Sequence, residues 1–540
     1  MIAGKLKFSS IEKVFFFAIA VLNLIPAFAS EFFATMDGAA HLYNSRIITE
    51  LLVNSNSALA DFFSFNSIPV PNWTGHFILS LFNLFLPANY AEKILVIIYL
   101  IGLPYSFRYL VKKINPDNML LSYFIFPFTY SFLFLLGFYN FSLALVFLFF
   151  TLGFWMDNEK KDFTKGSIFI LFLLITLTYF SHAFVFAILL FLLAAHIVFN
   201  NFFQHLDQLG LMFSNIFKRL KVLVIASFIP VLLFLYYIYS THTDTSNLSY
   251  VSPKELMEWL KNLRPLIVYN SVMEEAYTKK IVYLLALLCV IAVYDRINLI
   301  LNRNEKLSVA NKIYKVIKYF FALSDFWLIA AGAFLYLYFK LPDSDGNAGY
   351  VSVRLGLLFF LILILWLSSK KIPQWFSLTI ISLLLFCHFS LNNYYTTVLK
   401  DLGKMAFSCN SAAKQIAPGS IVLPLNYSDN WLVGHFSNYL GAEKPMIILE
   451  NYECSAGYFP LKWNESKIPN LKLGTIHATE LSCTQWKSNP NNPEKMIDYV
   501  FIFGNIESKT DPCNLQIKNV LLEHYTLIDN NEHTQLYAKK

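Results

Sequence analysis

The sequence has 540 residues, of which 56% are hydrophobic, 17% aromatic and only 14% charged. An ordinary globular protein carries about 25% charged residues, so this composition excludes a soluble enzyme of the usual kind and predicts repeated membrane spans. The net charge of +7 does not indicate a nucleic-acid partner, because lysine and arginine collect in the cytosolic loops of membrane proteins. We expect membrane lipids to surround much of the chain.

The first predicted span is the apolar run 14–29, which follows a lysine-rich start. The small-x-small pattern Ala27-Phe28-Ala29 before Ser30 also fits a signal-peptidase site. We favour an uncleaved span over a cleaved signal peptide. Either interpretation places the residues after Ser30 outside the cytosol.

Ten further apolar runs have the length needed to cross a bilayer core of about 30 Å. Lysine and arginine cluster in every second loop between them, as the positive-inside rule requires. Eleven crossings from a cytosolic N-terminus predict an all-α polytopic membrane bundle over residues 1–393. The ten runs lie near 91–110, 118–136, 139–156, 167–181, 183–200, 222–240, 280–298, 319–339, 351–369 and 374–391.

Two of the predicted outer segments are too long for simple turns. In segment 31–90, Gly38–Val53 has the periodicity of a helix, and Trp73–Leu86 is a proline-bounded run too short for a span, which predicts an interfacial helix. Segment 241–279 contains the capping box Ser252-Pro253-Lys254-Glu255, which predicts the beginning of another interfacial helix.

Residues 394–540 are more polar and predict a small extracytoplasmic α/β domain. The short apolar runs 420–425, 446–450 and 499–503 have strand length, and Asn530-Asn531 marks a terminal hairpin. An even set of cysteines predicts two disulfides in an oxidising compartment, with three pairings possible. No close CxxC pair indicates a cysteine zinc site. The four cysteines are Cys409, Cys454, Cys483 and Cys513.

The stretch Thr35–Asn44 is the most informative for chemistry. Asp37 and His41 are one helical turn apart at the predicted outer surface, and Asn44 continues their polar face. Aspartate is also among the best N-cap residues, and Asp37 lies where the helix should begin, so a purely capping role is an alternative. His41 alone is more typical of a buried structural histidine.

The order of these features resembles the GT-C superfamily of membrane glycosyltransferases. These enzymes use polyprenyl-phosphate-linked sugars and include protein O-mannosyltransferases and bacterial aminoarabinose transferases. Asp37 matches the acid of the family's first outer loop, segment 71–86 matches its proline-led second helix, and residues 394–540 are similar to the outer domain of many bacterial members. Members often carry Asp-Glu or Asp-x-Asp, whereas Gly38 and Ala39 follow Asp37 here, so the family's metal site does not carry over directly.

The resemblance implies a GT-C-like bundle in a bacterial inner membrane, with the C-terminal domain in the periplasm. It implies inverting transfer of a sugar from a polyprenyl-phosphate donor to a hydroxyl of a lipid, glycan or protein acceptor. Asp37 would be the general base and His41 would orient it. The departing lipid phosphate needs a cation, for which Arg354 at the outer end of a span is the candidate; a snorkelling interface anchor is the alternative for Arg354.

Other polar residues are weaker candidates. His182, Tyr43 and Asn44 are candidates for lining the same cavity, although ordinary packing is the favoured interpretation of His182. Asp343 and Asp345 form an acidic pair that could hold a divalent metal, although a solvated loop explains them too, and no other cofactor is predicted.

Two other classes of function stay open from the sequence. One is an O-antigen polymerase or ligase of the envelope, and the other is a transporter, flippase or envelope scaffold without catalytic activity. Transport needs polar residues through the middle of several spans, whereas polar residues here gather at the predicted outer ends. That distribution favours chemistry at the membrane surface.

Overall fold

The computed structural model describes residues 2–540 except 55–56, 206, 242–247, 303–319, 345–348, 465 and 468–495. The chain forms two compact units. Unit 1 comprises residues 1–24, 99–134 and 141–394, and unit 2 comprises residues 25–98, 135–140 and 395–540. The last boundary, between residues 394 and 395, lies next to the division expected at 393/394, but unit 2 also takes in the whole of the long outer segment 31–90.

Long apolar helices dominate the described residues, and nine of them can cross a membrane by length and composition. The chain is therefore an integral membrane protein. Six of these segments are single helices: α4 (Ala88–Ile114), α7 (Tyr139–Glu159), α9 (Ala183–His205), α10 (Leu209–Ser240), α12 (Ser271–Leu301) and α15 (Val351–Ser368). The other three are Ser10–Phe28, Pro116–Leu135 and Gln374–Gln415. Ser10–Phe28 includes the end of α1 (Ile2–Leu22), and Gln374–Gln415 includes α16 (Gln374–Ala412).

Among the described residues, nine segments and not the predicted eleven are long and apolar enough to cross a membrane. The predictions at 167–181 and 319–339 coincide with shorter helices, α8 (Lys165–Ser181) of 17 residues and α14 (Phe326–Lys340) of 15 residues. At 1.5 Å per residue, α14 is about 22 Å long and does not cover a bilayer core by itself. Of the span predicted at 319–339, residue 319 lies outside the described part of the chain.

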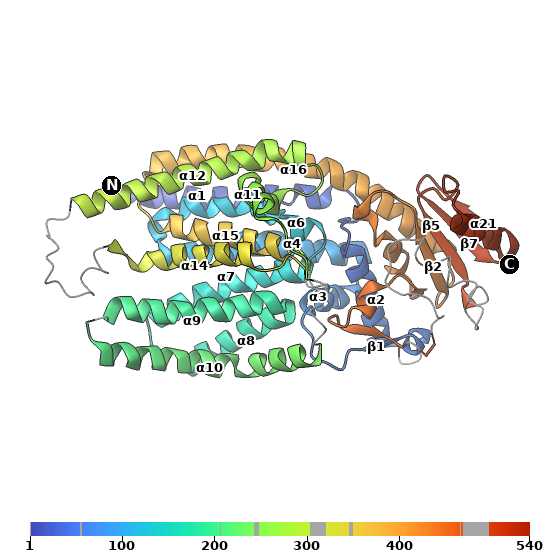
Figure 1. The fold of residues 1–540 in the computed structure, drawn as a ribbon, viewed down its shortest axis with the longest axis horizontal. Coiled ribbons are helices and arrows are strands. Elements are labelled where there is room, and N and C mark those ends of the chain that lie inside the picture. Colours follow the sequence, from blue (N-terminus) through green and yellow to red (C-terminus); the bar gives the residue numbers. More distant parts are fainter. Residues whose placement is uncertain are drawn as a thin grey trace. The chain divides into compact units, whose positions relative to one another are not determined.

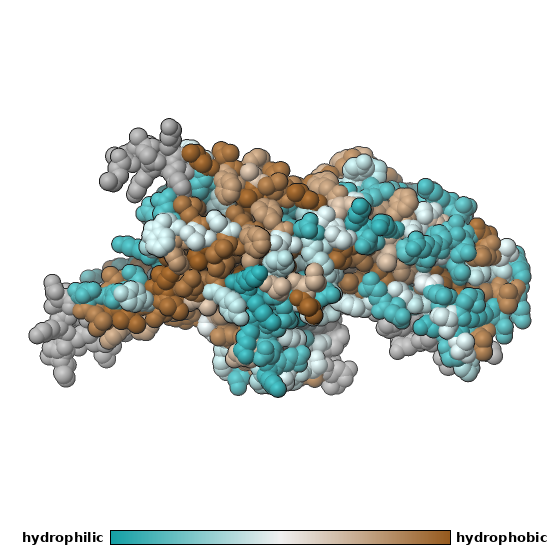
Figure 2. All heavy atoms as spheres, turned by 90° about the horizontal axis from the view of Figure 1, so that it is seen from above, coloured by the Kyte–Doolittle hydropathy of each residue, from teal (hydrophilic) through white to brown (hydrophobic). Residues whose placement is uncertain are grey.

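Within unit 1, α8, α9 and α10 lie side by side and α14 packs along α15 (Figure 1). The helices differ sharply in burial: 83% of the most apolar window of α15 is buried, against 17% for α12. Figure 2 shows hydrophobic residues gathered over the helices of unit 1. Outward-facing apolar side chains on α10 and α12 are what contact with lipid requires, whereas α15 is a central helix of the unit.

The serine cap of the capping box predicted in the second outer segment is present. The Ser252 hydroxyl accepts a hydrogen bond from the backbone N–H of Glu255, 3.2 Å away, and Pro253 is the first residue of α11 (Pro253–Asn262). Proline fits this position because the first N–H groups of a helix have no partner within the helix.

Unit 2 contains a five-stranded sheet in the order β3-β2-β5-β7-β6. Figure 1 labels three of its strands, β2, β5 and β7. Its core strands β2, β3 and β5 are parallel, and β6 and β7 form the antiparallel terminal hairpin that the sequence predicts. The predicted α/β character of the C-terminal region is therefore confirmed. The elements are β2 (Ile421–Asn426), β3 (Ile447–Ile448), β5 (Tyr499–Phe503), α21 (Pro512–His524), β6 (Tyr525–Asn530) and β7 (Thr534–Lys539).

The first outer segment is folded onto the C-terminal residues of unit 2. Helix α2 (Gly38–Val53) packs against α3 (Thr74–Asn83) and against the 3-10 helix Phe436–Gly441. A two-stranded antiparallel sheet joins β1 (Phe63–Phe65) to β4 (Leu461–Trp463). Segments almost 400 residues apart in sequence thus form one packed body, because neither covers its own apolar face alone.

The cysteine prediction needs correction. Cys409 and Cys454 are free thiols, so the two disulfides expected from four cysteines are wrong. Both are buried, Cys409 in α16 and Cys454 in α17 (Tyr452–Ser455), and the Cys454 thiol donates a hydrogen bond to Oδ1 of Asn44 at 3.5 Å. Cys513 is disulfide-bonded, and Cys483 lies outside the described residues.

Candidate active site

Asp37 stands at the N-cap position of α2, but its side chain does not cap the helix. The hydroxyl of Thr35 accepts the hydrogen bond from the backbone N–H of Gly38 instead, at 3.2 Å. The backbone N–H of Asp37 donates to the carbonyl of Leu136, 2.9 Å away. A capping role therefore does not explain the Asp37 carboxylate.

Two glycines make this close approach possible. A Cβ on Gly38 would lie 2.3 Å from the Thr35 hydroxyl oxygen and 2.7 Å from the Tyr139 hydroxyl oxygen. Gly137 has a φ of +99°, and a Cβ there would lie 2.6 Å from the backbone nitrogen of Gly38. The second acid that GT-C members often carry directly after the first has no room at position 38.

The Asp37 carboxyl is only 8% exposed and is surrounded by titratable groups. Burial raises the pKa of Asp37, while the nearby His435 and His41 rings and a hydrogen bond from Tyr452 counteract that shift. Nε2 of His435 lies 3.8 Å from Oδ1 of Asp37. A buried carboxyl of this kind is a candidate for proton transfer.

His435 is held firmly on its other side. Its Nδ1 lies 2.6 Å from Oε1 of Glu450, and its ring stacks on Tyr452 with centroids 4.3 Å apart. The second Glu450 oxygen accepts hydrogen bonds from Ser437 and Asn438 at 2.9 and 2.6 Å. Burial lowers the pKa of His435, but Glu450 and Asp37 together raise it above its ordinary value. Glu450 thereby directs the free nitrogen of His435 towards Asp37.

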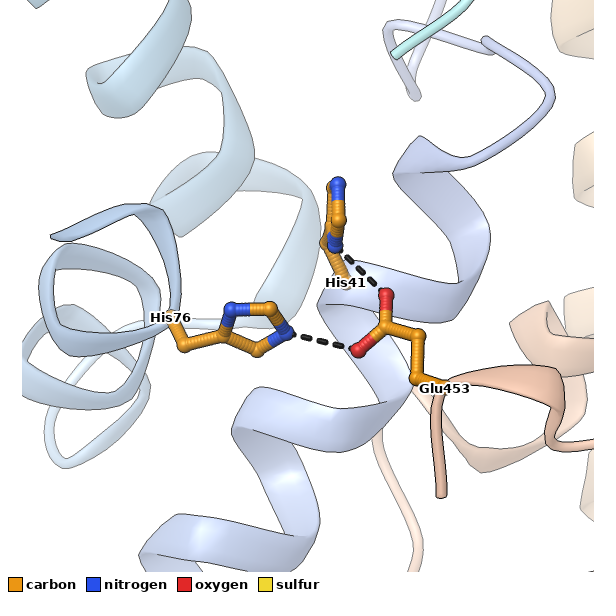
Figure 3. Close-up of side chains that lie close together, drawn as sticks. All are labelled: His41, His76 and Glu453. Atoms are coloured by element: carbon orange, nitrogen blue, oxygen red, sulfur yellow. Dashed lines mark hydrogen bonds and ion pairs between the residues drawn. The ribbon is translucent and has the colours of Figure 1, made fainter. Parts of the chain in front are cut away.

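A second group of buried side chains lies next to Asp37 along α2. His41 from α2, His76 from α3 and Glu453 from α17 meet with the carboxylate between the two rings (Figure 3). Nδ1 of His41 is 2.6 Å from one Glu453 oxygen, and Nε2 of His76 is 2.8 Å from the other. The three residues are 4%, 0% and 1% exposed. Their ligand-type atoms lie within 4.8 Å of one another, which suits a metal ion.

In this second group, the carboxylate and the histidine rings favour the charged forms of one another. Burial by itself raises the pKa of Glu453, but His41 and His76 lower it to about 2, so the carboxylate is ionised. Burial lowers the pKa of His41, and Glu453 and Asp37 raise it above its ordinary value.

Two of the residues expected to line a cavity are instead used in packing. The Tyr43 hydroxyl donates to the carbonyl of Met446 at 2.7 Å and accepts from the backbone N–H of Ile448 at 3.0 Å. The Asn44 side chain exchanges two hydrogen bonds with Asn451, at 3.0 and 2.8 Å. Both residues fix α2 against the C-terminal segment that carries Glu450 and Glu453.

The predicted phosphate-binding residue lies in unit 1. Arg354 belongs to the first turn of α15 and is only 8% exposed, which does not fit a snorkelling anchor. Its Nη1 is 3.5 Å from Nε2 of His182, and its guanidinium carbon lies 5.6 Å from the ring centroid of Phe141. Unit 1 thus brings together two residues that the sequence singles out, Arg354 and His182.

Of the acidic pair proposed as a metal site, the structure describes Asp343, which has another role. The Asp343 carboxylate accepts a hydrogen bond from the backbone N–H of Ser352 at 2.9 Å, and the Asp343 carbonyl accepts one from Val351 at 3.0 Å. These bonds secure the beginning of α15. Asp345 lies outside the described residues.

Sequence reasoning missed four residues of this site: His76, His435, Glu450 and Glu453. His76 and Glu453 are 377 positions apart, so no local spacing connects them. The only available signal was the position of His76 on the proline-bounded helix that follows the Asp37 segment.

Comparison with known proteins adds no relative to this picture. No protein-family model and no curated protein matches the chain.

Proposed function

We propose that the protein is a membrane glycosyltransferase of GT-C type. It transfers a sugar from a polyprenyl-phosphate donor to an acceptor hydroxyl at the outer face of a bacterial inner membrane. The observation that carries this proposal is the Asp37 carboxyl, which is buried, does not cap its helix and faces a histidine oriented by Glu450. The resemblance of the chain's layout to GT-C enzymes supplies the reaction class.

In the proposed reaction, the acceptor hydroxyl oxygen attacks the anomeric carbon of the donor sugar. Asp37 takes the hydroxyl proton as the new carbon–oxygen bond forms. The bond between the anomeric carbon and the phosphate oxygen breaks, and its electron pair leaves with the polyprenyl phosphate. One displacement of this kind inverts the anomeric configuration.

His435 has the geometry of a positioning residue for the base. Its Nε2 faces Asp37 at 3.8 Å, and Glu450 fixes the opposite ring nitrogen. The orienting role that the sequence assigns to His41 is thus better suited to His435, because His41 directs its Nδ1 at Glu453.

Arg354 is the proposed contact for the donor phosphate. A guanidinium group binds phosphate oxygens through two parallel hydrogen bonds, and charge-assisted bonds of this kind are about twice as strong as neutral ones. Phe141 and His182 hold the Arg354 side chain in unit 1. The charge that develops on the leaving phosphate would be stabilised there.

The test is turnover by the purified full-length protein in lipid nanodiscs with a panel of polyprenyl-phosphate sugars. We expect at least one donor to give free polyprenyl phosphate and a glycosylated acceptor with inverted anomeric configuration by NMR. Asp37→Asn should lower the rate by about 10²- to 10⁴-fold, the usual contribution of a general base. Asp401→Asn is the matched control, because Asp401 is an exposed acid of α16 paired with Lys404.

Full activity of the Asp37→Asn variant would exclude Asp37 as the base. Absence of turnover with every donor of the panel would remove the support for a polyprenyl-phosphate glycosyltransferase.

A further inference from the structure

We propose that His41, His76 and Glu453 form a zinc site that joins the first outer segment to the C-terminal segment of unit 2. The three side chains come from α2, α3 and α17 and converge at one buried point (Figure 3). This site is distinct from the acidic pair considered in the sequence, and it does not depend on the proposed glycosyltransfer.

The donor set has the chemistry that zinc prefers. Zinc in proteins is bound by imidazole nitrogens at about 2.0–2.1 Å and carboxylate oxygens at about 2.0–2.2 Å, and two histidines with one glutamate are a known three-ligand set that leaves one position open. Calcium and magnesium take oxygen ligands instead, so two imidazoles exclude them as the preferred occupant.

The contact between His41 and Glu453 is short, but it does not have the geometry of a hydrogen bond. Nδ1 of His41 and Oε1 of Glu453 are 2.6 Å apart, yet neither atom has a hydrogen-bond partner of acceptable geometry. A metal ion placed between these two atoms would give each of them a ligand bond.

Small movements would accommodate the ion. Ligand atoms of a tetrahedral zinc are roughly 3.3 Å apart, as follows from bond lengths of about 2.0–2.2 Å. The observed contacts of 2.6 and 2.8 Å to Glu453 require the carboxylate to shift by roughly 1 Å or less on this scale. The histidine nitrogens already lie within 4.8 Å of the other ligand atoms.

Both histidines also have the backbone partners that metal-binding histidines commonly have. Nδ1 of His76 lies 2.9 Å from the carbonyl oxygen of Asn72, which leaves Nε2 as the ligand atom. The backbone of Gly137 hydrogen-bonds the His41 ring. Such carbonyl contacts fix the tautomer and the orientation of a ligating imidazole.

A bound zinc ion would have a clear structural effect. It would fix α2 against α3 and against the segment Asn451–Cys454, and α2 begins directly after Asp37. The ion would therefore stabilise the backbone that presents the proposed base, whichever reaction that base serves.

The first test is the metal content of the full-length protein, purified in detergent without chelators and with an affinity tag that contains no histidine. We expect about one zinc per chain by mass spectrometry. After removal by a chelator, titration with zinc chloride should restore one equivalent, and cobalt(II) should give the visible absorption of a low-symmetry site with nitrogen and oxygen ligands. A chelated wild type that takes up neither zinc nor cobalt would overturn the proposal.

The second test uses variants. His41→Ala, His76→Ala and Glu453→Gln should each reduce the bound zinc to well below one equivalent. His524→Ala, which removes an exposed histidine of α21, is the matched control and should keep the full amount. Equal zinc binding by the His41→Ala/His76→Ala double variant would contradict the assignment.

A third measurement separates loss of metal from loss of fold. Zinc should raise the melting temperature of the chelated wild type and of His524→Ala, because a ligand that binds only the folded state stabilises it. The melting temperature of His76→Ala should not respond to zinc. An equal rise in His76→Ala would place the ion elsewhere. None of these readouts requires a sugar donor, so their failure is distinguishable from failure of the proposed function.

Discussion

Two groups of buried polar side chains, one in each unit, differ in the partners of their charged groups. In unit 2, three carboxyls and three histidines are paired, as in Asp37–His435–Glu450 and His41–Glu453–His76. In unit 1, Arg354 packs on an aromatic ring beside His182. Histidine–carboxylate pairs suit proton transfer and metal binding, whereas a guanidinium held by aromatic packing suits an anion. We therefore propose proton transfer for the Asp37 group and anion binding for Arg354.

The largest expected effect that tests this difference is a loss of affinity for the donor when Arg354 is replaced. Arg354→Ala should weaken binding of the lipid-phosphate donor by about 100-fold, near 3 kcal/mol, because it removes a charge-assisted contact. Binding is measured by titrating donor into the nanodisc-embedded protein. Lys340→Ala removes an exposed cation at the end of α14 and should leave donor affinity unchanged. Unaltered affinity in Arg354→Ala would show that Arg354 does not bind the phosphate.

The next effect concerns the backbone of the Asp37 turn. Gly38→Ala should lower the free energy of unfolding by about 1–3 kcal/mol, since the added Cβ would meet the Thr35 and Tyr139 hydroxyls at 2.3 and 2.7 Å. Thermal unfolding checks this expectation. Gly332→Ala is the control, because a Cβ there meets nothing within 4 Å. Equal melting temperatures for the two variants would show that the turn is looser than its geometry indicates.

A smaller effect tests the positioning role of His435 through its partner. Glu450→Gln keeps the shape of the side chain but removes its charge, so kcat should fall about 10-fold or more while the donor KM stays unchanged. Glu532→Gln, at an exposed position, should leave both parameters unchanged. A rise in KM without a fall in kcat would mean that Glu450 supports substrate binding and not the base.

The smallest effect concerns the attachment of α2 to the C-terminal segment. Tyr43→Phe removes one hydroxyl with two backbone partners and should cost about 1–2 kcal/mol of stability. Tyr90→Phe is the matched control at a tyrosine that is 57% exposed. Indistinguishable unfolding curves for the two variants would show that this contact contributes little.

Sequence patterns predicted the local elements well. Helix α2 has the bounds Gly38–Val53 in both the prediction and the structure, and β5 lies at 499–503 as expected. Helix α3 ends at Asn83 instead of continuing to Leu86. These elements follow from periodicity and capping, which depend only on neighbouring residues.

The site itself was predicted only in part. Asp37 and His41 were found because they share one helical turn. His435 and Glu453 were not, because they reach the site through packing of α2 against segments about 400 residues later. The disulfide prediction failed for a related reason: a count of cysteines does not show that Cys409 and Cys454 are buried apart from any partner thiol.

The most direct test of the central claim is single-turnover sugar transfer by Asp37→Asn at saturating donor, with donor affinity measured on the same sample. We predict a chemical step slowed by about 10²- to 10⁴-fold and a donor Kd equal to that of the wild type. A variant that transfers sugar at the wild-type rate, or that loses donor binding instead of the chemical step, would contradict the assignment of Asp37 as the base.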